Sequence, residues 1–92
     1  MKSYLLTWQT EDERKIREYV GREQVIVTEK NEEDAILKGS CLLMELIAAG
    51  GKLSCKSSVE DDGIAIKIYD QKLRGRQIAE IRNIRAKEIW EV

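Results

Sequence analysis

Alternation of apolar and polar side chains predicts a β-strand at the start of the chain. Over residues 2–8, Tyr4, Leu6 and Trp8 fall on one side, which is the period of two that a half-buried strand requires. Residues 24–29 contain three consecutive β-branched residues, Val25 to Val27, which pack well on a pleated surface. The sequence therefore predicts a second, short strand there.

Two segments between and after these strands have helical spacing. The first covers residues 11–20, where Thr10 and Glu13 form a capping-box pattern at the start and Gly21 provides a stop. The second covers residues 32–49, with Asn31 as the expected cap and an apolar stripe that repeats every three to four residues. Gly39 inside this second helix predicts that another part of the chain comes close to it.

Strand patterns return after residue 51. Residues 53–59 and 64–69 are separated by an acidic turn that ends in Asp62 and Gly63, so this segment predicts a hairpin. A further turn at residues 72–75 leads to expected strands at 77–83 and 87–92. The spacing of Ile78, Ile81 and Ile84 also fits a helix, but the richness in β-branched residues favours strands.

These elements predict a single α+β domain that spans residues 1–92. The order is β-α-β-α followed by a meander of three or four strands, and we expect an antiparallel or mixed sheet with both helices packed on one face. Hydrophobic side chains make up 42 % of the chain, which is enough for one core.

Charge is distributed unevenly along the chain. Residues 1–63 carry a net charge of −4 and residues 64–92 a net charge of +3. The C-terminal cations predict a basic face on the closing strands, and Tyr69 or Trp90 offers a stacking surface beside them. The expected binding residues are Lys72, Arg74, Arg76, Arg82, Arg85, Lys87 and Tyr69, with Lys67 on the same strands. The alternative interpretation is that these cations only serve solubility and protect sheet edges.

Catalytic chemistry finds little support in the sequence. The chain has no histidine, and its glycines match neither the GxGxxG nor the P-loop spacing. One weaker alternative is a metal-dependent enzyme that uses Asp62, Asp70 and Lys72, but about two acid-x-Lys triplets are expected by chance and two occur. We therefore expect no catalytic site, no bound metal and no cofactor.

The resulting hypothesis is a small non-enzymatic binding or accessory protein that inhibits or regulates a larger protein through protein–protein contacts. The alternative is a nucleic-acid-binding protein that uses the basic face, although a pI of about 5.6 argues against a dedicated phosphate binder. No apolar run is long enough for a bilayer, so no membrane partner is expected. Two isolated cysteines, Cys41 and Cys55, predict buried, reduced thiols and a cytoplasmic location.

Overall fold

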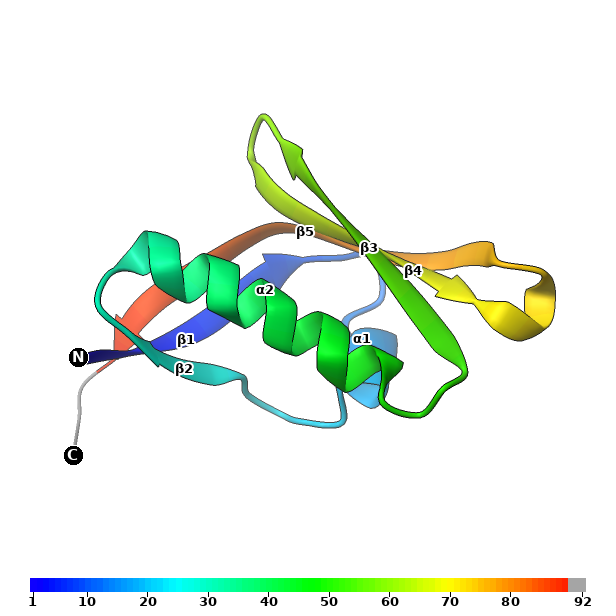
Figure 1. Ribbon diagram of the computed structural model, residues 1–92, viewed down its shortest axis with the longest axis horizontal. Helices are drawn as coiled ribbons and strands as arrows, with labels where there is room; N and C mark the ends of the chain where they lie inside the picture. Colours follow the sequence, from blue (N-terminus) through cyan, green and yellow to red (C-terminus); the bar gives the residue numbers. More distant parts are fainter. Residues whose placement is uncertain (90–92) are drawn as a thin grey trace.

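The computed structural model describes residues 1–89 and has the order β-α-β-α-β-β-β (Figure 1). Its elements are β1 (Lys2–Gln9), α1 (Glu13–Val20), β2 (Ile26–Glu29), α2 (Glu32–Ala48), β3 (Leu53–Glu60), β4 (Gly63–Asp70), the short 3-10 helix η1 (Gln71–Leu73) and β5 (Arg76–Ile89). Trp90 and the end of the expected strand at 87–92 lie outside the described residues. The predicted α+β class is confirmed.

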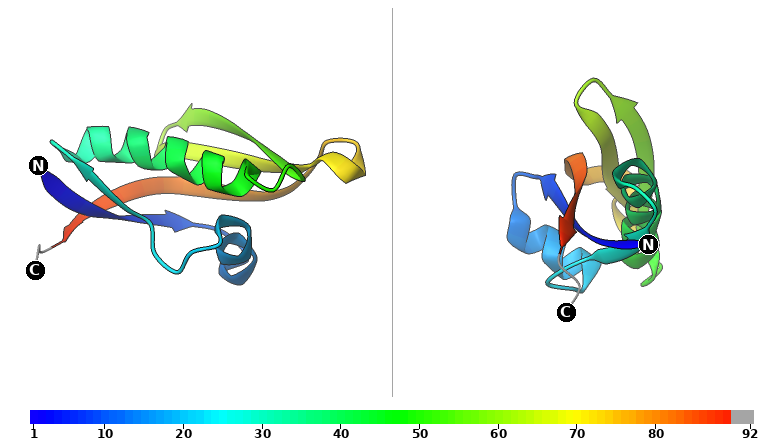
Figure 2. Two further views of the ribbon diagram at one scale, coloured as in Figure 1. Left: turned by 60° about the horizontal axis from the view of Figure 1, so that its bottom comes forward. Right: turned by 90° about the vertical axis from the view of Figure 1, so that its left-hand side faces the viewer.

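The five strands form one antiparallel sheet in the order β2-β1-β5-β4-β3. The last strand of the chain, β5, is therefore the central strand, while β2 and β3 are the two edges. Figure 2 shows α2 lying along one face of the twisted sheet, and α1 contacts α2 at the end of β1. Both helices contribute buried side chains to one hydrophobic core.

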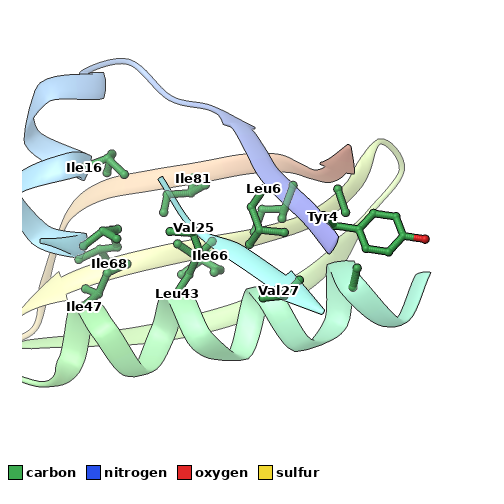
Figure 3. Close-up of a cluster of buried hydrophobic side chains, with 14 residues drawn as sticks. Tyr4, Leu6, Ile16, Val25, Val27, Leu43, Ile47, Ile66, Ile68 and Ile81 are labelled. Atoms are coloured by element: carbon green, nitrogen blue, oxygen red, sulfur yellow. The ribbon is translucent and has the colours of Figure 1, made fainter. Parts of the chain in front are cut away.

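The core fills the space between α2 and the sheet (Figure 3). Ile66 from β4 and Ile81 from β5 are fully buried there, and Leu43 of α2 packs in the same cluster. Gly39 explains how closely the helix approaches the sheet, because a Cβ at this position would overlap the side chain of Leu6 on β1. The close approach predicted for Gly39 is thus confirmed.

The expectation of two separate C-terminal strands is wrong, because β5 runs without a break from Arg76 to Ile89. The pairing of β5 with β4 has two irregularities, and the one between Ile81 and Ile84 explains the misleading pattern. Ile81 pairs with Ile66 and Ile84 with Ile64, so one additional residue of β5 is inserted between these two pairs. Asn83 lies at this bulge with a positive φ of 50°. A bulge changes the side-chain period from two to three, which is why the isoleucines have helix-like spacing.

Helix α1 begins two residues later than expected and has a different cap. The side chain of Asp12 accepts a hydrogen bond from the backbone N–H of Lys15 at 3.2 Å, so Asp12 is the N-cap. The Thr10 hydroxyl instead donates to the carbonyl oxygen of Glu80 at 2.8 Å. This contact with β5 is long-range, and it replaces the local capping box that the spacing predicted. The Asn31 cap of α2 is confirmed, since its side chain accepts from the N–H of Asp34.

Candidate functional site

The face of the sheet that points away from the helices carries most of the candidate binding residues. We define the basic row as four cations on this face: Lys67 from β4 and Arg82, Arg85 and Lys87 from β5. Pairing places the three β5 cations opposite uncharged residues of β1: Lys87 faces Leu5, Arg85 faces Thr7 and Arg82 faces Gln9. The side chains of Leu5, Thr7 and Gln9 alternate with the buried Tyr4 and Leu6, so all of them lie on the outer face.

The bulge at Asn83 is what aligns the basic row. In a regular strand, residues 82 and 85 would lie on opposite faces of the sheet, because their separation is odd. Register shifts against both neighbouring strands insert the additional residue between Arg82 and Arg85. Both guanidinium groups consequently belong to the same outer face, together with Lys87.

The cations of the basic row differ in how far neighbouring groups already occupy their hydrogen-bond donors. The Nε of Arg82 lies 3.8 Å from a Glu80 carboxylate oxygen, and this arginine is about half exposed. Arg85 donates from Nη2 to the carbonyl oxygen of Asp62 at 2.7 Å, so it also holds the turn between β3 and β4. Lys67 pairs across the ladder with Glu80, but neither it nor Lys87 forms an ion pair within residues 1–89.

Tyr69 lies on the same outer face, at the β4 end of the row. Its ring is occupied on one side, since the Nζ of Lys56 lies 5.6 Å from the ring centroid. Ser54 pairs with Tyr69 and Lys56 with Lys67, which confirms that these side chains share one face. Sequence reasoning missed Lys56, although alternation along residues 53–60 places it among the outward positions.

The other three predicted binding residues lie elsewhere. Lys72 belongs to η1, Arg74 follows it with a positive φ of 56°, and Arg76 begins β5. All three are exposed, Lys72 and Arg74 in the connection between β4 and β5 and Arg76 at the start of β5. Arg76 and Arg82 are six residue steps apart along β5, a distance of about 20 Å. The predicted cations are therefore spread along β5 and its connection to β4, and Tyr69 lies between those at the two ends.

The acidic residues of the weaker metal-site hypothesis are also far apart. Asp62 precedes β4 and Asp70 ends it, so about 26 Å of extended strand separates them. Asp70 instead caps η1, because its carboxylate accepts from the backbone N–H of Lys72 at 2.8 Å. Within residues 1–89 no cluster of three or more histidine, cysteine, aspartate or glutamate side chains is arranged to hold a metal ion.

Both cysteines are free thiols, but the expectation that both are buried is wrong for Cys41. Cys41 is exposed because it lies on the side of α2 that is turned away from Leu43 and the core. Cys55 is partly buried beneath the same helix. Loss of solvation on burial raises the pKa of the Cys55 thiol above its ordinary value.

A cleft of about 460 Å³ lies between the start of α1 and the first half of β5. It is lined by Thr10, Glu11, Asp12, Lys15, Gln77, Ile78, Ala79, Glu80 and Arg82. Three acidic and two basic side chains give this cleft a mixed charge, whereas the basic row is dominated by one sign. Arg82 belongs to both surfaces, but the basic row as a whole carries charge of one sign, so the row is the better candidate for a charged partner.

Comparison with protein-family models, with curated proteins and with solved structures gives no match to this chain. Among the described residues, neither helix combines the length and the apolarity that a membrane crossing needs. Functional inference accordingly depends on the geometry of the outer face.

Proposed function

We propose that this protein is a non-enzymatic binding module whose outer sheet face takes an acidic segment of a larger protein, which it inhibits or regulates. The observation that carries the proposal is the alignment of Lys67, Arg82, Arg85 and Lys87 on one face. Helix α2 packs on the opposite face, and the start of α1 borders this face only at its Arg82 end. The sheet holds the cations at fixed spacing, so little backbone freedom is lost when a partner binds.

Charge complementarity supports a partner that is rich in carboxylates. Glu80 is the acidic side chain next to the row on the two central strands, and it is already engaged by Arg82. Lys67 and Lys87 keep their ammonium groups available to a partner. Two arginine guanidinium groups can bind carboxylates in a bidentate manner, which adds directionality to the attraction.

A single-stranded nucleic acid fits the face less well than an acidic peptide. Sequence-tolerant binding of single strands combines a basic groove with aromatic rings on which successive bases stack. Among residues 1–89, Tyr69 is the aromatic side chain that lies beside the basic row, and Lys56 lies over one side of its ring. Within the described residues the cations are therefore accompanied by one partly covered ring instead of a series of stacking surfaces, and this favours carboxylate groups over nucleotides.

Fluorescence anisotropy with a labelled oligoglutamate peptide tests the proposal. The variant Arg82→Gln/Lys87→Gln removes two charges from the basic row. Each exposed ion pair contributes about 0.7 kcal/mol, so the double variant should bind roughly tenfold more weakly. Affinity should also fall as salt is raised, because exposed charges are screened.

The matched control is Lys72→Gln/Arg74→Gln, which removes the same charge from the connection between β4 and β5. Its affinity should stay within about twofold of that of the unmodified protein. Equal losses in the two double variants would mean that only net charge matters and would contradict a site on the outer face. Tighter binding of a single-stranded oligonucleotide of equal charge would favour the nucleic-acid alternative. Circular dichroism of each variant checks that the fold is retained.

A further inference from the structure

The edge strand β3 is an uncovered surface that the proposed binding face does not use. It pairs with β4 on one side and with no described strand on the other, along all eight residues from Leu53 to Glu60. Proline is absent from the chain, so every residue of this edge keeps its backbone donor. A long edge that keeps all of its backbone donors can pair with a further strand.

The register of the hairpin determines which backbone groups point outward. Glu60 pairs with Gly63 across a two-residue turn, so the backbone groups of these two residues face each other. Hydrogen-bonding direction alternates along an antiparallel strand. The N–H and C=O groups that point away from β4 therefore belong to alternate residues, Leu53, Cys55, Ser57 and Val59.

We propose that β3 pairs with β3 of a second copy of this chain, antiparallel and about a two-fold axis at Ser58. This register places Ser57 opposite Val59 of the second copy, and these are residues whose backbone groups point outward. It also covers Val59, whose 86 % exposure is the highest among the large apolar side chains of residues 1–89. The paired sheets continue across the axis as one ten-stranded sheet.

Charge complementarity selects this register over its neighbours. With Ser58 at the axis, Lys56 lies directly opposite Glu60 of the second copy, and symmetry repeats the pair. Both side chains lie on the outer face, where Ser58 donates from Oγ to the Glu60 carboxylate at 2.8 Å. An axis at residue 56 would bring two lysines together, and an axis at residue 57 would place both charges opposite serines.

Sedimentation velocity over a concentration series tests whether the chain self-associates and whether these charges direct it. Lys56→Glu gives two glutamates on the strand, and Glu60→Lys gives two lysines, so each variant alone should dimerise at least about tenfold more weakly. An equimolar mixture of the two variants restores every opposite-charge pair and should recover the dimer. Circular dichroism checks that both variants are folded before mixing.

Crosslinking tests the register. Ser58→Cys places two thiols across the axis at a non-hydrogen-bonded pair, where a disulfide can form, so mild oxidation should yield a covalent dimer. Ser54→Cys is the matched control on the same side of the same strand, and it has no counterpart within reach. The unmodified protein controls for Cys41 and Cys55.

Three results would overturn the proposal. The first is a chain that remains monomeric up to millimolar concentration, and the second is a dimer that both charge variants retain. The third is crosslinking of the Ser54→Cys variant as readily as of the Ser58→Cys variant. This inference does not depend on the proposed function, because oligoglutamate binding is measured on variants that leave Lys56 and Glu60 unchanged.

Discussion

Replacing Gly39 by alanine measures how tightly α2 lies against β1. An added Cβ would lie 2.6 Å from Cδ2 and 2.9 Å from Cγ of Leu6, with Cδ1 closer still. Leu6 is 4 % exposed, so its side chain has little room to move. Overpacking of this kind costs about 2 kcal/mol, while the better helix propensity of alanine returns about 1 kcal/mol. We expect Gly39→Ala to lower the free energy of unfolding by about 1 kcal/mol.

The same substitution should have the opposite sign once Leu6 is shortened. Leu6→Ala alone should cost about 3 kcal/mol through lost burial and a residual cavity. In that background the Cβ at residue 39 enters space that the leucine has vacated, and only the gain in helix propensity remains. Gly39→Ala should then stabilise the Leu6→Ala protein by about 1 kcal/mol, a coupling of about 2 kcal/mol between the two positions.

Urea unfolding followed by far-ultraviolet circular dichroism provides the four free energies of this cycle, with the m-value as a check on two-state behaviour. Gly50→Ala is the control, because a Cβ at that position meets no atom within 4 Å. It should change stability by less than about 0.5 kcal/mol. An equal loss from Gly39→Ala in both backgrounds would refute the overlap with Leu6 as the cause.

Two further predictions concern the bulge and the thiols. Asn83 has a φ of 50°, so Asn83→Gly should be more stable than Asn83→Ala by about 1 kcal/mol in the same urea assay, and equal stabilities would contradict a left-handed bulge. Iodoacetamide should modify Cys41 before Cys55, because Cys41 is exposed and the pKa of Cys55 is raised by burial. The folded chain then keeps the Cys55 proton to a higher pH than the unfolded chain. The free energy of unfolding should therefore fall as the pH rises through the raised pKa of Cys55, and it should fall less in the Cys55→Ala variant.

Local sequence patterns were sufficient to predict most of the elements. The buried Tyr4 and Leu6 alternate with less buried neighbours, and this period of two is typical of a strand with one buried face. The second helix was predicted to within one residue, because Asn31 marks its start and Gly50 and Gly51 follow its end. The pattern failed along β5, where a bulge at Asn83 adds a residue. The pairing of β5 with β1 and β4 determines this insertion, so the spacing of apolar residues along the chain does not reveal it.

The candidate site was only partly predictable, for a related reason. Arg82, Arg85 and Lys87 lie on one strand, so their grouping could be anticipated from the sequence. Arg74 is close to them in the chain, yet the turn at the end of β4 places it at the far end of the sheet. Lys56 is distant in the chain and lies beside Tyr69 because of the hairpin register. Neighbours across strands depend on register, which composition and spacing do not determine.

The position of β5 in the sheet also bears on why the basic row exists. Lysine and arginine on an edge strand prevent unwanted pairing with other chains, and this was one of the two non-functional interpretations of the C-terminal cations. β5 is hydrogen-bonded to β1 on one side and to β4 on the other, so it has no free edge to protect. The edges of the sheet are β2 and β3, and on β3 the outward cation Lys56 has a complementary Glu60 on the same face. Edge protection therefore does not account for Arg82, Arg85 and Lys87. Two explanations remain, solubility and recognition of an anionic partner. Only recognition predicts that loss of these charges weakens oligoglutamate binding.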